Sequence, residues 1–152
     1  MGTIVKWQAY GLNEIELDIP PTVYPPREDT GLLDRTLAKL DSTKGNRLLE
    51  IGCGSGAVSI AAALRGWNVS ACDVNPLAIA ATRGNAAKLG IEWEGEIREG
   101  GPGDIGNWEP LQGVDVIAWN LPYIEPDYGE NLGAMEDSAL IGQDEAEQLL
   151  NA

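Results

Sequence analysis

The sequence contains no histidine and only two cysteines, Cys53 and Cys72. Without histidine the chain has neither an imidazole base nor a histidine metal ligand. The two cysteines fit no zinc-binding spacing and indicate no disulfide framework, so we expect no metal site and a reduced, cytoplasmic setting. No apolar run is long enough to span a bilayer, and the N-terminus lacks the basic-then-apolar pattern of a signal peptide, so we expect no membrane partner.

Basic residues are missing from the last third of the chain. All ten lysines and arginines lie at or before Arg98, whereas twelve acidic residues follow from Glu99 onward, and the net charge is −14. A protein that binds free nucleic acid needs lysine and arginine to replace its counterions. The charge distribution therefore disfavours unaided nucleic-acid binding, although solubility or adaptation to high salt would also explain the acidic balance.

The length and the element pattern fit a single domain over residues 1–152. We expect an N-terminal hairpin and a helix within residues 1–45, and a core of alternating strands and helices within residues 46–152. The hairpin strands are predicted at Ile4–Tyr10 and Glu14–Ile19, and the first helix by an apolar stripe at Leu32, Leu33, Leu37 and Leu40. The core strands are predicted at Arg47–Ile51, Trp67–Cys72, Ile91–Arg98 and Val114–Trp119, and the helices at Ala57–Leu64, Pro76–Leu89 and Asp144–Leu150.

One stretch organises the core, the apolar strand Arg47–Ile51 followed by glycines at alternate positions, Gly52, Gly54 and Gly56. Glycine adopts backbone angles closed to other residues and lets a ligand approach the main chain. We expect an amphipathic helix to begin at Ala57, so that strand, turn and helix form the start of a nucleotide-binding sheet. Helical crossovers between successive strands imply right-handed parallel units. The predicted fold class is therefore α/β, a Rossmann-like parallel sheet flanked by helices.

The glycine turn alone is compatible with NAD, FAD or S-adenosylmethionine. Its Gly-Cys-Gly-Ser-Gly spacing departs from the G-x-G-x-x-G pattern of dinucleotide enzymes. Asp73 follows Gly54 by nineteen residues, at the end of the second core strand. A carboxylate there can accept hydrogen bonds from both hydroxyls of a ribose, although an ordinary strand-end aspartate before a turn would look the same. Ligands of such sheets bind beyond the carboxyl ends of the strands, where both features fall.

These motifs resemble the class I S-adenosylmethionine-dependent methyltransferases, over about residues 24–123. The resemblance implies the methyltransferase fold and S-adenosyl-L-methionine as the cofactor. The acidic residue expected near the adenine amine is Glu99, with Asp104 as the alternative. The cofactor-binding residues implied by the resemblance are Glu28, Asp29, Thr30, Glu50, Gly52, Cys53, Gly54, Gly56, Asp73, Val74, Glu99 and Asn120.

The tetrapeptide Asn120-Leu121-Pro122-Tyr123 is similar to the Asn-Pro-Pro-Tyr signature of enzymes that methylate planar nitrogens, such as a glutamine amide or the exocyclic amine of adenine. Such a nitrogen is a poor nucleophile because it shares its lone pair. An asparagine oxygen and a backbone carbonyl can accept its two N–H groups and direct the lone pair at the methyl group. The expected catalytic residues are Asn120, Pro122 and Tyr123, with Tyr123 offering a flat face to the substrate.

The segment Val23–Thr30 resembles the Val-Tyr-x-Pro-x-Glu-Asp-Thr segment of the HemK-like protein glutamine methyltransferases, in the archaeal and eukaryotic branch that acts on class 1 release factors. The resemblance implies methylation of the glutamine in a Gly-Gly-Gln loop, and a small zinc-binding activator subunit as a partner. The acidic charge is compatible with a protein substrate whose glutamine has basic neighbours. Without the resemblance, Glu28, Asp29 and Thr30 would be interpreted as helix capping and first-turn charge.

Two alternatives remain open. Asn-Leu-Pro-Tyr also occurs in ribosomal RNA adenine dimethylases, so an RNA or DNA adenine N6-methyltransferase is the first alternative. The family continues after Leu150 with a fifth strand, a helix and an antiparallel pair, so we expect a C-terminally truncated domain in which Val114–Trp119 is an edge strand. Dimerisation through this edge, or a partner that covers it, would explain the short chain equally. A cofactor-binding domain without catalysis is the second alternative.

Overall fold

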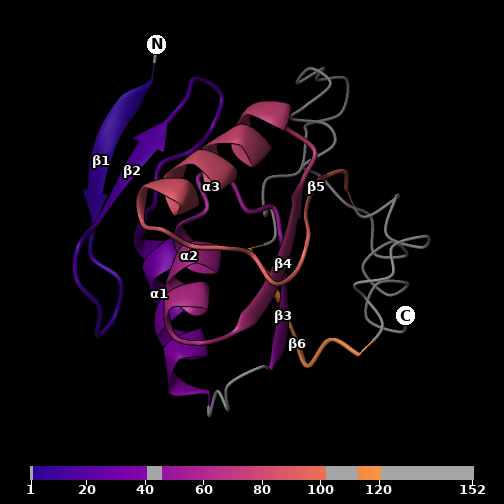
Figure 1. Ribbon diagram of the computed structural model, residues 1–152. Helices are drawn as coiled ribbons and strands as arrows, with labels where there is room; N and C mark the ends of the chain where they lie inside the picture. The colour runs from indigo at the N-terminus through magenta and orange to yellow at the C-terminus, as the bar shows by residue number, and fades with distance from the viewer. Residues whose placement is uncertain (1, 41–45, 102–112, 121–152) are drawn as a thin grey trace, which may run out of the picture.

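The computed structural model describes residues 2–40, 46–101 and 113–120 (Figure 1). These residues form a hairpin, three helices and a four-stranded parallel sheet. In chain order the elements are β1 (Thr3–Trp7), β2 (Ile15–Ile19), α1 (Glu28–Lys39), β3 (Arg47–Ile51), α2 (Ala57–Leu64), β4 (Asn68–Asp73), α3 (Pro76–Lys88), β5 (Ile97–Glu99) and β6 (Val116–Trp119).

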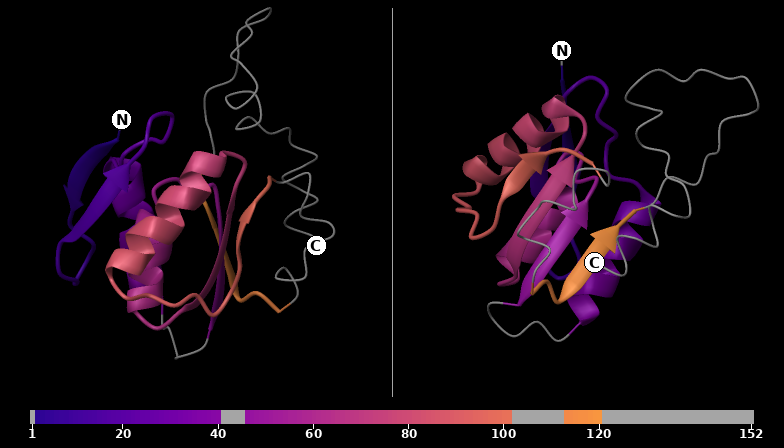
Figure 2. Two further views of the ribbon diagram at one scale, coloured as in Figure 1. Left: turned by 45° about the horizontal axis from the view of Figure 1, so that its top comes forward. Right: turned by 90° about the vertical axis from the view of Figure 1, so that its right-hand side faces the viewer.

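The parallel sheet has the strand order β5-β4-β3-β6. The two crossovers run through α2 and α3 in the same direction, and right-handed connections therefore place both helices on one face of the sheet. Figures 1 and 2 show the hairpin on the far side of α3 from the sheet. The α/β prediction is confirmed, and within the described residues β6 is an edge strand, as expected.

The hydrophobic core has two apolar layers with the helices between them, and a smaller cluster on the opposite face of the sheet. Side chains of β3 alternate, so Leu48 faces the helices while Leu49 and Ile51 pack with Cys72 on the opposite face of the sheet. The layer between the hairpin and the helices includes Trp7, Ile15, Leu17, Ile19, Ile60 and Ala78. The layer between the helices and the sheet includes Leu37, Leu48, Val58, Trp67 and Val69.

The helix α2 is buried on nearly all sides, so the prediction of an amphipathic helix from Ala57 is wrong. Its bounds are those predicted, but Ile60 packs toward the hairpin whereas Val58 packs toward the sheet. A helix enclosed by two layers needs no polar face. Among the described residues, no helix is both long enough and apolar enough to cross a membrane.

The leucine stripe predicted for α1 is only half correct. Leu33 and Leu37 pack against the core, whereas Leu32 is 64% exposed and Leu40 is 41% exposed. The packed face of the helix instead includes Asp34, which is almost completely buried. Its carboxylate pairs with Arg65 at 2.6 Å and accepts the backbone N–H of Tyr10 at 2.9 Å. A buried ion pair therefore joins α1, the hairpin turn and the end of α2.

Replacing Asp34 with alanine is expected to lower the free energy of unfolding by about 3–5 kcal/mol, because the buried Arg65 guanidinium loses its counter-charge. Urea denaturation measures this change. Removing both partners in Asp34→Ala/Arg65→Ala should cost less than the sum of the single variants. Alanine at the exposed Glu16 is the control, with a change within about 0.5 kcal/mol. Additive losses for the two partners would contradict this role of the pair.

Several predicted boundaries differ from the structure. The strand predicted at Ile91–Arg98 is reduced to β5, three residues long. At Gly95 the backbone passes directly against the Val69 carbonyl and the Ser70 side chain, which leaves no room for a side chain. The Ser70 hydroxyl accepts the N–H of Glu96, and the Glu96 carbonyl accepts the backbone N–H of Ala71 at 2.9 Å. β4 begins at Asn68, α3 ends at Lys88 and β6 begins at Val116, while Asp144–Leu150 lies outside the described residues.

Candidate functional site

The glycine turn lies at the carboxyl end of β3 and has the left-handed backbone that was predicted. Gly52, Gly54 and Gly56 have φ of +75°, +56° and +90°. The N–H groups of Gly52 and Cys53 donate to the Cys72 carbonyl at 2.8 and 3.1 Å, which ties the turn to β4. A Cβ added at Gly52 or Gly54 would meet no atom within 4 Å. The turn therefore presents its backbone to open space.

The helix α3 supports the same turn from below through two buried polar side chains. Thr82 donates its hydroxyl to the Gly54 carbonyl at 3.1 Å, and Asn85 donates to the Ser55 carbonyl at 2.9 Å. A Cβ at Gly56 would stand 3.0 Å from Thr82, so this glycine also permits close helix packing. Neither Thr82 nor Asn85 was predicted from the sequence to support the turn. The sequence signal that would have indicated them is a pair of polar residues, three positions apart, on the face of α3 that is buried.

Asp73 ends β4 beside the glycine turn. Its carboxylate accepts the N–H of Gly54 at 2.9 Å through one oxygen and the N–H of Asn75 at 2.9 Å through the other. The sheet register pairs Asp73 with Glu99 at the end of β5, and the Gly100 N–H donates to the Asp73 carbonyl. Val74 follows directly and is half-buried. The structure thus brings Asp73, Val74 and Glu99 together at one edge of the turn.

Glu50 lies beneath the turn, not on its open side. Glu50 is 4% exposed, and its carboxyl group accepts the Ser59 hydroxyl of α2 at 2.6 Å. Burial raises the pKa of Glu50 to about 8, with the nearby Asp73 adding to the increase and the Ser59 bond opposing it. Glu50 is therefore mostly protonated at neutral pH. Burial likewise raises the pKa of the Cys53 thiol, so Cys53 remains a neutral thiol.

The raised pKa of Glu50 predicts a loss of stability with increasing pH. Because its folded pKa of about 8 exceeds the ordinary value of 4.5, the unfolded chain releases this proton first, and stability falls between these values. The expected fall is up to about 1.4 kcal/mol per pH unit. Glu50→Gln keeps an acceptor for Ser59 but does not titrate. Urea denaturation from pH 5 to 8 measures the free energy of unfolding. Relative to the wild type, the stability of Glu50→Gln should increase as the pH rises, whereas the exposed control Glu92→Gln should show the same pH dependence as the wild type. If Glu50→Gln and the wild type had the same pH dependence of stability, the raised pKa of Glu50 would be contradicted.

The N-terminal segment and the end of β6 meet at the same edge of the sheet. The register pairs Ile51 with Trp119, so Gly52 and Asn120 follow at neighbouring strand ends. The Asn120 side-chain nitrogen donates to Asp29 at 3.0 Å, across 91 residues of sequence. Thr30 has the capping role, since its hydroxyl accepts the Arg27 N–H at 3.1 Å, and Glu28 is exposed in the first turn of α1.

Three predicted site residues lie outside the described part of the chain, namely Pro122, Tyr123 and the alternative Asp104. Of the others, the structure brings the three glycines, Asp73, Val74, Glu99, Asn120 and the first turn of α1 to the carboxyl ends of the strands. It places the side chains of Glu50 and Cys53 in the interior beneath them.

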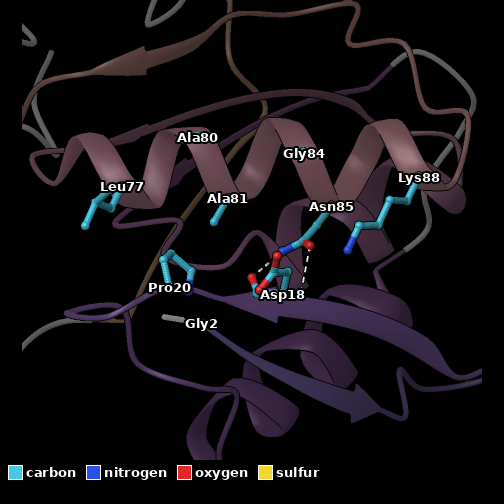
Figure 3. Close-up of a pocket in the computed structure, with 9 residues that line it drawn as sticks. All are labelled: Gly2, Asp18, Pro20, Leu77, Ala80, Ala81, Gly84, Asn85 and Lys88. Atoms are coloured by element: carbon cyan, nitrogen blue, oxygen red, sulfur yellow. Dashed lines mark hydrogen bonds between the residues drawn. The ribbon is translucent and has the colours of Figure 1, made fainter.

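A separate groove of about 270 Å³ lies between β2 and α3 (Figure 3). Asn85 points toward Asp18 there, accepting its backbone N–H at 2.8 Å and donating to its carbonyl at 3.1 Å. The groove contains none of the predicted site residues. Its lining is Gly2, Asp18, Pro20, Leu77, Ala80, Ala81, Gly84, Asn85 and Lys88. The candidate site therefore remains at the strand ends.

Comparison with curated proteins finds relatives that are longer than this chain. A provisionally assigned protein N5-glutamine methyltransferase of Methanocaldococcus jannaschii is 30% identical over 141 residues, which are 90% of this chain and 66% of the relative. The release factor glutamine methyltransferase of Moorella thermoacetica is 31% identical over 115 residues, 72% of this chain and 39% of the relative. The chain thus spans about two thirds or less of the length of these relatives.

Solved structures and a family model agree on the fold. A methyltransferase from Thiobacillus denitrificans, solved with S-adenosyl-L-homocysteine, has a TM-score of 0.54 and 23% identity, covering 78% of this chain and 42% of that one. Residues 31–121 match the family model for ribosomal protein L11 methyltransferase (PrmA). S-adenosyl-L-methionine is the cofactor that this family implies. The chain belongs to this family, within the class I S-adenosylmethionine-dependent methyltransferases.

Proposed function

We propose that this chain transfers a methyl group from S-adenosylmethionine to the side-chain amide nitrogen of a glutamine in a class 1 translation release factor. The observation that carries the proposal is the position of Asn120. The pairing of Ile51 with Trp119 makes Asn120 the neighbour of the glycine turn, so a group that can accept an amide N–H stands beside the cofactor-binding backbone. The relatives named as glutamine methyltransferases support the choice of acceptor.

The residues at the strand ends fit the cofactor. The open space above Gly52 and Gly54 admits a ligand against the backbone, and Asp73 offers a carboxylate for ribose hydroxyls. Val74 and Glu99 lie beside Asp73, where Glu99 can accept the adenine amine. Glu50 and Cys53 act from beneath by shaping the turn. When bound, the cofactor supplies an electrophilic methyl group on a sulfonium sulfur.

The chain's own residues would then orient a poor nucleophile. The Asn120 oxygen accepts one N–H of the target amide, and the backbone that leads into Pro122 accepts the other. Holding both N–H groups aims the nitrogen lone pair at the methyl group and stabilises the positive charge that develops. Tyr123 would cover the flat amide. The amide nitrogen takes the methyl group from the sulfonium sulfur, which keeps the electron pair of the broken C–S bond, and the amide then gives up one N–H proton to water. No histidine is needed, because the methylated amide is acidic enough for water to take this proton.

Two further partners belong to this proposal. The release factor would present its glutamine from a Gly-Gly-Gln loop with basic neighbours, to which the acidic chain of net charge −14 is complementary. A small zinc-binding activator subunit would cover an apolar flank of the methyltransferase.

Methyl transfer to defined substrates tests the proposal. The chain is incubated with deuterated S-adenosylmethionine and an archaeal-type release factor, with and without the activator, and mass spectrometry locates the methyl group. We expect label on the glutamine of Gly-Gly-Gln and none when that glutamine is replaced by asparagine. Ribosomal protein L11 and structured RNA serve as parallel substrates. Label on either of these alone, or on none of them while the cofactor binds, would contradict the proposal.

A further inference from the structure

The hydrogen bond between Asp29 and Asn120 connects the first turn of α1 to the end of β6. We propose that Asp29 is a positioning residue, which holds the Asn120 side chain with its oxygen facing the methyl acceptor and so selects acceptors that donate an N–H. This inference rests on the proposed function and deepens it. It assigns to Asp29 a role in substrate positioning, whereas the family resemblance implied a role in cofactor binding.

The Asp29 carboxylate is fixed by contacts at both of its oxygens. Oδ1 accepts the backbone N–H of Thr30 at 2.9 Å, and Oδ2 accepts the Asn120 side-chain nitrogen at 3.0 Å. Asp29 also stands in the first turn of α1, where the helix dipole favours a negative charge. The Asn120 hydrogen bond is the largest of the effects that lower the pKa of Asp29. The carboxylate is therefore ionised at neutral pH and can only accept hydrogen bonds.

An ionised partner determines which way the Asn120 carboxamide points. A carboxamide has an NH₂ group on one side and an oxygen on the other. Only the NH₂ group can face Asp29, since the reverse orientation would bring the amide oxygen against a carboxylate oxygen. The Asn120 oxygen is thus directed away from Asp29. The charge-assisted bond also draws the NH₂ protons toward Asp29, which makes the Asn120 oxygen a stronger acceptor.

The side chains of Asp29 and Asn120 are both exposed, so a role in function can be distinguished from a role in stability. Exposed hydrogen bonds and charges contribute little to folding stability because water replaces them readily. Removing Asp29 should therefore leave the fold intact. The effect should appear in how well the site orients its acceptor, where misplacement of a group can cost up to about 100-fold in rate.

The first test compares Asp29→Ala with the matched control Glu16→Ala, which removes an exposed carboxylate on β2. We expect Asp29→Ala to lower kcat for a Gly-Gly-Gln substrate about 10- to 100-fold, with the Kd for S-adenosylhomocysteine changed less than about threefold. In an Asn120→Ala background the same substitution should have almost no further effect on kcat. Equal losses in both backgrounds, or a loss explained by the Kd alone, would overturn the proposal.

The second test does not depend on the methyl acceptor. In ¹⁵N-labelled chain, the side-chain amide resonances of Asn120 are identified by their absence from Asn120→Ala. We expect them to shift in Asp29→Ala and in Asp29→Asn, and to stay in place in Glu16→Ala. Unchanged Asn120 resonances in the Asp29 variants would overturn the proposal. If the wild type methylates no glutamine while these resonances shift, the proposed function fails but the orienting contact stands.

Discussion

Replacing Asp73 with alanine is expected to raise the Kd for S-adenosylmethionine by about 100-fold or more. A carboxylate that accepts two ribose hydroxyls makes two charge-assisted hydrogen bonds, each contributing about 1.5–3 kcal/mol, and a tenfold change in Kd corresponds to about 1.4 kcal/mol. The same carboxylate holds the Gly54 and Asn75 N–H groups, so the substitution also releases the glycine turn. Equilibrium dialysis with labelled cofactor measures the change.

A matched control distinguishes the loss of a ligand contact from the loss of an aspartate that only holds the backbone of the sheet. Asp115 precedes β6 at the opposite end of the sheet, and its carboxylate accepts the Arg47 backbone N–H at 2.8 Å. Asp115→Ala removes a bond of the same kind as that between Asp73 and Gly54. We expect it to leave the Kd within about threefold of the wild type. Similar losses of affinity in both variants would show that Asp73 acts only through the fold.

The second large effect is expected at Asn120. Asn120→Ala should lower kcat for methyl transfer by about 10²–10³-fold, the range seen when one preorganised polar group of an active site is removed. The cofactor Kd should change less than about tenfold, because Asp73 and the glycine turn remain. Steady-state kinetics with the release factor, together with dialysis, gives both values.

Two companion variants sharpen the Asn120 result. Asn120→Asp keeps an acceptor oxygen but places a second carboxylate against Asp29, so it should be as inactive as alanine. Asn13→Ala removes an exposed asparagine between β1 and β2 and should retain full activity. An Asn120→Ala enzyme with nearly normal kcat would remove this residue from the proposed mechanism.

The parts of the fold that the sequence predicted well depend on local chemistry. β3 and α2 have the predicted bounds because an apolar run meets glycines whose left-handed angles other residues rarely adopt. Asn75 caps α3 by accepting the Leu77 N–H at 3.0 Å, and Gly66 and Gly90 have positive φ after α2 and α3. Each of these signals acts within a few residues, so one sequence is sufficient to find it.

The features that the sequence did not predict depend on contacts between distant segments. The burial of Asp34 requires Arg65, and the two-sided burial of α2 requires the hairpin. β5 is shorter than predicted, and Gly95 just before it lies directly against Val69 and Ser70 of β4. The contact between Asp29 and Asn120 joins two motifs that the sequence identified separately, and only the register of β3 with β6 brings Asn120 to this edge.

The most direct test of the central claim is a calorimetric titration of the 152-residue chain with S-adenosylmethionine and, separately, with NAD. The glycine spacing and Asp73 predict binding of one S-adenosylmethionine per chain in the micromolar range, and no detectable binding of NAD. NAD binding, or a folded chain that gives no heat with S-adenosylmethionine, would contradict the claim that these strand ends form the methyl-donor site.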